Sequence, residues 1–218
     1  MPFEWLVDNT RWALKPRTHE SVRAALLDTA ANYRKSIWRD EECRVQIWIE
    51  KDALSSVVLP VTDEYDVPLY PARGYSSITF LHDAALDIAA LDVPVYIYHF
   101  GDFDPSGVNA AECIEDDLRE LAPDAEVHFE RVAVTEEQIR RWRLPTRPTK
   151  QSDKRAAQFG SSVSVELDAI PPNILRDLVR RVIERHMPRR RLLKLRREET
   201  RERDQIARMV RSLDADDE

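Results

Sequence analysis

Short apolar runs alternate along this chain with amphipathic stretches, and that alternation constrains the fold more than any other feature. The runs are rich in β-branched and aromatic residues, which is typical of strands, and they lie at residues 44–49, 67–70, 94–100 and 126–134. The stretches between them have helical periodicity and lie at residues 52–65, 76–91 and 108–121. Because each of the first three strands enters a helix, we expect an α/β fold: a parallel four-stranded sheet flanked by helices.

Helical segments are also predicted on both sides of this core. Residues 1–43 form an N-terminal helical lead-in, whose helix is expected at 18–36 with Thr18 as its cap. The core spans residues 44–134, and Pro60 is expected to kink or shorten its first helix. A loop-rich connection covers residues 135–170, and a C-terminal extension of basic helices covers residues 171–218.

Composition excludes several classes of protein. The chain has 218 residues, of which 33% are charged and 43% hydrophobic, which is polar but not the composition of a disordered protein. Its two cysteines form no CxxC pair and predict neither a disulfide framework nor a zinc site. No apolar run approaches the roughly 20 residues of a membrane span, and the first residues do not resemble a signal peptide. We therefore expect a soluble cytoplasmic protein with no membrane partner.

The net charge of −7 is unevenly distributed. Residues 176–211 contain 14 Lys and Arg against 6 Asp and Glu, whereas residues 1–175 carry a net charge of −11. An acidic body with a basic tail suits an enzyme in which carboxylates hold a cation and a separate element holds a nucleic-acid backbone. The alternative is that the tail is simply a solvated helix.

Three acids follow the ends of two predicted strands: Glu50 after the first, and Asp102 and Asp104 after the third. The carboxyl ends of parallel strands meet at one edge of a sheet, so these side chains are expected to converge. Close carboxylates repel one another unless a cation compensates them, and Mg2+ prefers such oxygen ligands. Ser106 is expected to cap the following helix. The alternative is that this segment is a turn whose acids cap a helix.

The motifs around these acids resemble those of the Toprim domain, and in particular the Toprim domain of the A subunit of type IIB topoisomerases and of the related meiotic double-strand-break protein. The resemblance covers residues 44–169. It is carried by Ile49-Glu50-Lys51-Asp52-Ala53, Arg73-Gly74-Tyr75, Gly101-Asp102-Phe103-Asp104-Pro105-Ser106-Gly107 and Val165-Glu166-Leu167-Asp168-Ala169.

This resemblance implies that Glu50, Asp102 and Asp104 hold Mg2+ or Mn2+ and that Glu50 also acts as general acid or base. It further implies a Toprim-like fold and phosphodiester cleavage or strand transfer on DNA. In type IIB enzymes a tyrosine from a preceding winged-helix domain cuts the DNA, but only 49 residues precede Glu50 here. Tyr33 lies on the apolar stripe of the first predicted helix and is expected in the core. A protein partner or a second copy would then supply the tyrosine, or water would be the nucleophile.

The remaining candidates are weaker. Lys51 and Arg73 follow strand ends and are expected to bind nucleic acid, with surface charge as the alternative. His82 and His99 are expected to be packing residues with satisfied hydrogen bonds. Two alternatives to a metal-dependent nuclease or topoisomerase-like enzyme stay open: a non-catalytic module that binds nucleic acid or assembles with a partner, and an enzyme that transfers phosphate on a nucleotide.

Overall fold

The structure is a computed structural model that describes residues 16, 18–72, 77–149, 155 and 159–212. The chain divides into two compact units. The larger unit comprises residues 36–195, and the smaller one combines the described residues up to Lys35 with those from Arg196 onward. Within the described residues, no helix is both long enough and apolar enough to cross a membrane.

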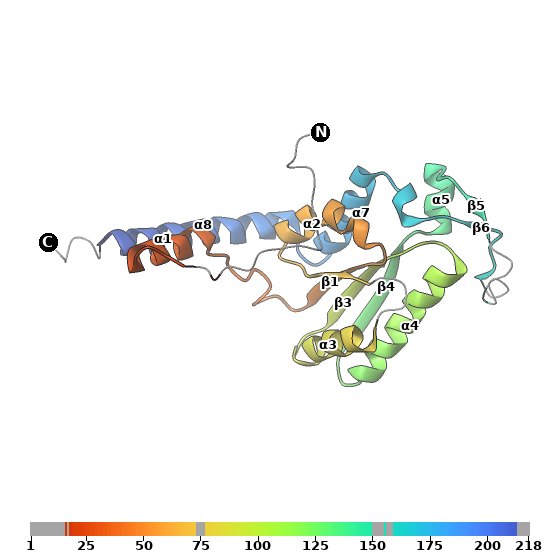
Figure 1. The fold of residues 1–218 in the computed structure, drawn as a ribbon, viewed down its shortest axis with the longest axis horizontal. Coiled ribbons are helices and arrows are strands. Elements are labelled where there is room, and N and C mark those ends of the chain that lie inside the picture. The colour runs from red at the N-terminus through yellow and green to blue at the C-terminus, as the bar shows by residue number, and fades with distance from the viewer. Residues whose placement is uncertain (1–15, 17, 73–76, 150–154, 156–158, 213–218) are drawn as a thin grey trace. The chain divides into compact units, whose positions relative to one another are not determined.

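A four-stranded parallel sheet forms the centre of the larger unit (Figure 1). Its strands are β1 (Arg44–Ile49), β2 (Leu69–Pro71), β3 (Val95–Phe100) and β4 (Val127–Ala133). Their order is β2-β1-β3-β4, and every neighbouring pair is parallel. The predicted α/β fold, with a parallel four-stranded sheet flanked by helices, is therefore confirmed.

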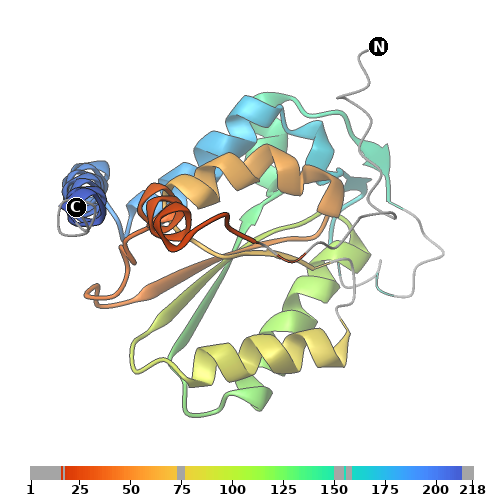
Figure 2. The same ribbon diagram turned by 60° about the vertical axis from the view of Figure 1, so that its left-hand side comes forward.

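Helices cover both faces of this sheet (Figure 2). One face carries the helices α2 (Ser55–Glu64) and α7 (Pro172–Glu184), and the other carries α3 (Ile78–Ala89) and α4 (Pro105–Leu121). Side chains of β1 alternate between two cores: Ile47 and Ile49 pack on the α2/α7 side, and Trp48 packs on the α3/α4 side. All three are fully buried, as expected for a central parallel strand covered on both faces.

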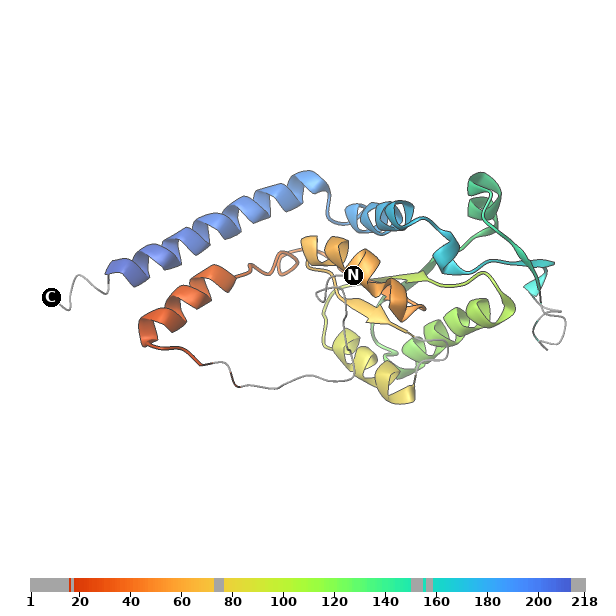
Figure 3. The ribbon, with the colours of Figure 1, turned by 45° about the horizontal axis from the view of Figure 1, so that its top comes forward.

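Apart from the first 3-10 turn, which follows β1, the remaining elements precede β1 or follow β4. They are α1 (Val22–Asn32), the 3-10 turns η2 (Asp52–Leu54) and η3 (Leu167–Ala169), α5 (Glu136–Trp142), β5 (Arg147–Pro148), β6 (Val163–Ser164) and α8 (Arg189–Ser212). β5 and β6 pair into a small antiparallel sheet (Figure 3). Helical structure is interrupted between α7 and α8, where Pro188 lies (Figure 3).

The first basic helix of the extension, α7, is part of the core. Five of its side chains are buried against the sheet and α2: Leu175, Leu178, Val179, Val182 and Ile183. Basic side chains on and after α7 pair with acids of the same unit, as in Arg185–Glu130 at 2.6 Å and Arg191–Glu41 at 2.8 Å. Part of the positive charge predicted for a tail therefore neutralises the acidic body.

Three local predictions were wrong in whole or in part. α2 runs through exposed Pro60 to Glu64, so the proline does not end the helix early, whereas the predicted kink stays a prediction. Ser21 rather than Thr18 caps α1, since the helix begins one turn later than predicted. Asp104 rather than Ser106 caps α4, whose first residue is Pro105.

Within the smaller unit, hydrogen bonds join the end of α1 to α8. Tyr33 ends α1 and lies half-exposed rather than in the core, contrary to the sequence prediction. Its hydroxyl donates to the Glu202 carboxylate at 2.6 Å, and the Lys35 amide donates to Glu199 at 2.9 Å. The bond to Glu202 raises the pKa of Tyr33, so the phenol is held in its protonated form.

Candidate functional site

Two adjacent strands bring the predicted acids to one edge of the sheet. β1 and β3 are hydrogen-bonded neighbours, with Ile49 opposite Phe100 at their carboxyl ends. Glu50 follows β1 directly, and its amide donates to the Phe100 carbonyl at 2.9 Å. Asp102 and Asp104 lie two and four residues beyond Phe100. The parallel register therefore places the first acid beside the loop that carries the other two.

Each of the three carboxylates accepts a hydrogen bond from a backbone amide. Glu50 Oε2 accepts from the Asp102 amide at 2.9 Å, which joins the two strand ends directly. Asp102 Oδ1 accepts from the Leu167 amide at 2.7 Å. Asp104 Oδ1 accepts from the Gly107 amide at 2.7 Å and caps α4. These bonds orient all three acids, and each uses one of the two carboxylate oxygens.

Two glycines make room for the Glu50 carboxylate. A β-carbon on Gly101 would lie 2.7 Å from Glu50 Oε2 and 2.6 Å from His99 Cε1. A β-carbon on Gly107 would lie 3.1 Å from Glu50 Oε2 and 2.6 Å from the Asp102 carbonyl oxygen. Both positions require glycine because of this close approach rather than because of a positive φ.

Burial makes the ionised forms of two acids costly. It raises the pKa of Glu50, and the charges of Asp102 and Asp104 raise it further, whereas the Asp102 amide and Arg131 lower it. Burial also raises the pKa of Asp102, with Asp104 and Glu166 adding to the effect. Each acid thus contributes to the electrostatic field of the others, so a cation placed among them would be favoured.

Arg131 is a half-buried cation beside these acids that the sequence analysis did not identify. It projects from β4, and its guanidinium donates to the carbonyls of Asp102, of Gly101 at 3.2 Å and of Val134 at 2.6 Å. Burial lowers its pKa, but the neighbouring carboxylates raise it. The fixed fork of the guanidinium therefore holds the loop that carries Asp102 against the end of β4. β4 also contains His128 and Glu130, so no feature of the sequence singled out Arg131.

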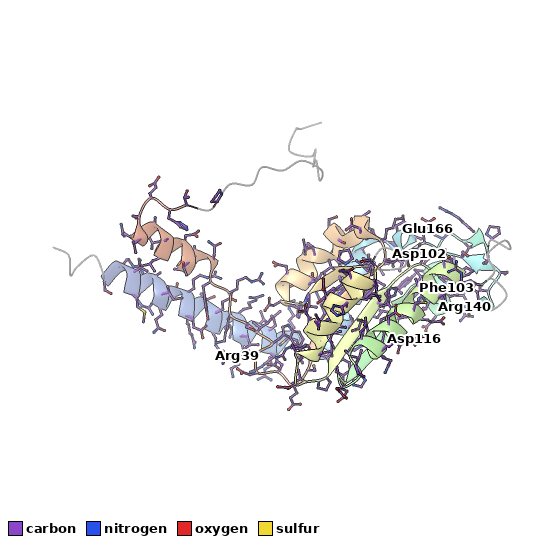
Figure 4. The ribbon with its side chains drawn as sticks, turned by 60° about the horizontal axis from the view of Figure 1, so that its bottom comes forward. Arg39, Asp102, Phe103, Asp116, Arg140 and Glu166 are labelled. Carbon is purple, nitrogen blue, oxygen red and sulfur yellow. The ribbon has the colours of Figure 1, made fainter. Side chains whose placement is uncertain are left out.

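A distant segment, residues 163–169, closes the third side of the site. The amide of Phe103 donates to the Val165 carbonyl at 2.8 Å, and the Val165 amide returns a bond at 2.9 Å. Together with the bond from Leu167 to Asp102, these contacts attach the segment to the aspartate loop. Figure 4 shows Asp102, Phe103 and Glu166 close together at this end of the sheet. The sequence analysis had placed these residues in a loop-rich connection and had not predicted their contact with the aspartate loop.

Lys51 is ion-paired to this segment. Its ammonium contacts the Asp168 carboxylate directly and lies 3.5 Å from Glu166. Glu166 also pairs with Arg147 of β5 at 2.5 Å. The prediction that Lys51 binds a phosphate stays a prediction, and in this structure the side chain instead ties β1 to the segment that follows β6.

The other predicted residues divide into three cases. Arg73, with the glycine turn at Gly74, lies outside the described residues. His82 is exposed, 3.8 Å from Asp83. His99 is buried at 1% exposure, and its Nδ1 has no hydrogen-bond partner, so the prediction of a satisfied packing histidine was only half right. Burial lowers the pKa of His99 to about 3, and the ring is therefore neutral at physiological pH.

The donors at this edge suit a hard divalent cation in kind but do not form a finished coordination shell. Carboxylate oxygens are the ligands that Mg2+ and Mn2+ prefer. However, no group of three or more His, Cys, Asp and Glu side chains in the described ranges is arranged to hold a metal ion. The predicted metal site of Glu50, Asp102 and Asp104 therefore stays a prediction.

A pocket of about 410 Å3 opens beside Asp104. It lies between the start of α4, the β5 region and the segment of residues 163–169, and we call it the Asp104 pocket. Ser106, Arg147 and Glu166 contribute polar groups to its wall. The candidate site therefore has a concave surface directly next to one of its acids.

Comparisons with models of protein families, with curated proteins and with solved structures found no match to this chain. The interpretation of the site therefore depends on its own geometry and on the motif resemblance described above.

Proposed function

We propose that this protein carries out metal-dependent phosphodiester chemistry on nucleic acid, with DNA as the substrate, in the manner of a Toprim nuclease or topoisomerase-like strand breaker. The observation that carries the proposal is the direct bond between Glu50 and the Asp102 amide, which unites two predicted metal ligands at adjacent strand ends. The raised pKa values of both acids give independent support, since a cation would relieve the cost of their charges.

Glu50, Asp102 and Asp104 would hold Mg2+ or Mn2+. Such a cation, when bound, neutralises the negative charge that develops on the transferring phosphoryl group. Arg131 would keep the Asp102 loop in place through its bonds to backbone carbonyls, and the Leu167 amide would orient Asp102. In this arrangement the chain supplies rigid positioning, which dominates phosphoryl transfer.

Glu50 is the residue best suited to move a proton. Its pKa is raised by burial, toward the range in which a carboxyl group exchanges protons near neutral pH. The Asp102 amide fixes Oε2. Glu50 could thus accept a proton from an attacking water or hydroxyl group.

Water is the nucleophile that this chain's own residues support. Tyr33 belongs to the smaller unit, and its phenol is held in the protonated form by Glu202. A phenol with a raised pKa is a poor nucleophile, because the phenolate is the reactive form. Tyr33 is therefore a poor candidate for a covalent, topoisomerase-like reaction, and we propose that a protein partner or a second copy would supply the tyrosine for such a reaction.

The experiment is incubation of the protein with supercoiled plasmid in Mg2+, in Mn2+ and in EDTA. We expect metal-dependent nicked or linear DNA with no protein attached to the ends. Covalently attached protein would favour a tyrosine nucleophile instead. The matched control is a Glu50→Gln variant, which should leave the plasmid intact. Plasmid that stays intact with the parent protein in both metals would contradict the proposal.

A non-catalytic module that binds nucleic acid or assembles with a partner is the second candidate. The observation in its favour is that the acids bond to amides and do not already converge on one point. Calorimetric titration with Mg2+ and Mn2+ separates the two functions, since an enzyme of the proposed kind must bind at least one of these ions.

A further inference from the structure

The Asp104 pocket adjoins the candidate site. It shares Asp104 with that site, and its other walls come from the start of α4, the β5 region and the segment that closes the site. Its volume of about 410 Å3 falls in the range of sites for single small molecules. A group bound there would lie next to a phosphate held at the predicted metal ligands.

Apolar side chains form much of the pocket wall. They are contributed by three separate segments and are Pro105, Pro145, Pro148, Val165 and Ala169. Proline rings and small aliphatic groups present smooth surfaces suited to the flat face of a planar ligand. Polar groups of Ser106 and Ser164 also line the wall and suit a ligand that carries hydroxyl or amino groups.

Charge in this wall is largely cancelled. Glu166 pairs with Arg147 at 2.5 Å and with Lys51 at 3.5 Å, and Lys51 also contacts Asp168. Arg147 of the wall and Lys51, which lies outside it, thus balance the two anions Glu166 and Asp168, leaving Asp104 as the additional charge at the edge of the pocket. A phosphate would find no net positive charge there, whereas a neutral group would meet no strong electrostatic penalty.

From this combination we propose that the Asp104 pocket receives one unpaired nucleoside, base and sugar, of the nucleic acid whose phosphate lies at Glu50, Asp102 and Asp104. This inference rests on the proposed function and adds a substrate class to it: strands with unpaired nucleotides. A base within a duplex is stacked and paired, so it must leave the helix to enter a pocket. A single strand has no such cost.

The test is a comparison of binding to a fluorescent single strand and to a hairpin duplex of the same length, by fluorescence anisotropy. Ca2+ replaces Mg2+, and a gel verifies that the DNA stays intact. The parent should bind the single strand at least about fivefold more tightly, the low end of what stacking one base contributes. Ala169→Leu, which fills the pocket, should remove that preference and leave duplex binding unchanged.

Ala125→Leu is the matched control. Ala125 is half-buried like Ala169, and it lines a separate hollow between Ala89 and Glu126. This variant should keep the preference for the single strand. A folded Ala169→Leu protein that also keeps the preference, or a parent that shows none, would overturn the proposal.

A second measurement applies to the parent protein and does not depend on the folding of any variant. 2-Aminopurine is placed at successive positions of the single strand, and one position should change its emission on binding because that base enters the pocket. Emission that is unaffected at every position would overturn the proposal. A parent that nicks plasmid but lacks the single-strand preference would disprove the pocket alone. A parent that has the preference but never cuts would disprove only the proposed function.

Discussion

Replacing Asp102 by Asn should abolish metal-dependent cleavage while leaving the fold intact. Asp and Asn have nearly the same shape, and the side-chain oxygen of Asn can still accept the bond from the Leu167 amide, which is 2.7 Å from Asp102 Oδ1. The substitution therefore removes the charge and keeps the packing. Loss of the charge affects stability differently for a metal ligand and for a residue that only stabilises the fold.

The expected change in stability follows from two opposing effects. Bonding an amide to a neutral rather than a charged oxygen loses about 1 kcal/mol. Removing a half-buried charge near Asp104 and Glu166 recovers free energy, because burial and those two acids raise the pKa of Asp102. The free energy of unfolding of the metal-free protein should thus change by less than about 1 kcal/mol.

The effect of magnesium on melting should separate the parent from the variant. At a concentration ten times the dissociation constant, binding to the folded state adds about 1.4 kcal/mol. For a unit of this size that raises Tm by about 3–6 °C. The parent should show this shift, and Asp102→Asn should not.

The assay pairs thermal melting in EDTA, Mg2+ and Mn2+ with plasmid nicking. Asp104 offers an internal comparison, because it caps α4 through the Gly107 amide. Asp104→Ala should cost about 0.5–2 kcal/mol even without metal. An Asp102→Asn protein that cuts plasmid as well as the parent, or a parent whose Tm ignores both metals, would refute the reasoning.

Three further predictions concern residues around the acids. Gly101→Ala should destabilise the protein by about 1–3 kcal/mol in urea unfolding, since the new β-carbon would lie 2.6 Å from His99 and 2.7 Å from Glu50. An unchanged urea midpoint of unfolding would show that the loop can shift to accommodate the methyl group without cost. Arg131→Lys should cost about 1–3 kcal/mol in the same assay, because a lysine keeps the charge but lacks the fork that reaches both the Asp102 and the Val134 carbonyl, and one carbonyl left buried and unpaired costs about that much. A variant as stable as the parent would show that Arg131 does not position this loop. The raised pKa of Glu50 means that the folded protein binds this proton more tightly than the unfolded chain, so the metal-free stability should fall as pH rises from about 4.5 through the folded pKa. Glu50→Gln should flatten that part of the curve, and a parallel decline in both proteins would contradict the assignment to Glu50.

The local pattern of the chain was enough to predict the sheet and the position of its acids. Alternating strand and helix patterns indicate parallel order, and parallel order carries Glu50 and Asp102 to the same edge. The predicted strand limits agree with the observed ones to within about two residues, because runs of β-branched residues end where polar loop residues begin. The capping residues were predicted less well: Ser21 and Asp104 replaced Thr18 and Ser106, since several residues near a helix start can serve as caps.

Contacts between distant segments were decided by the tertiary structure. The pairing of Phe103 with Val165, the bond from Leu167 to Asp102 and the ion pair of Lys51 with Asp168 each join residues more than 60 positions apart. Periodicity and turn chemistry act over a few residues and contain no information on such pairs. The cost of burying Glu50 and Arg131 likewise depends on what packs around them, because desolvation is a property of the folded surroundings rather than of the residue.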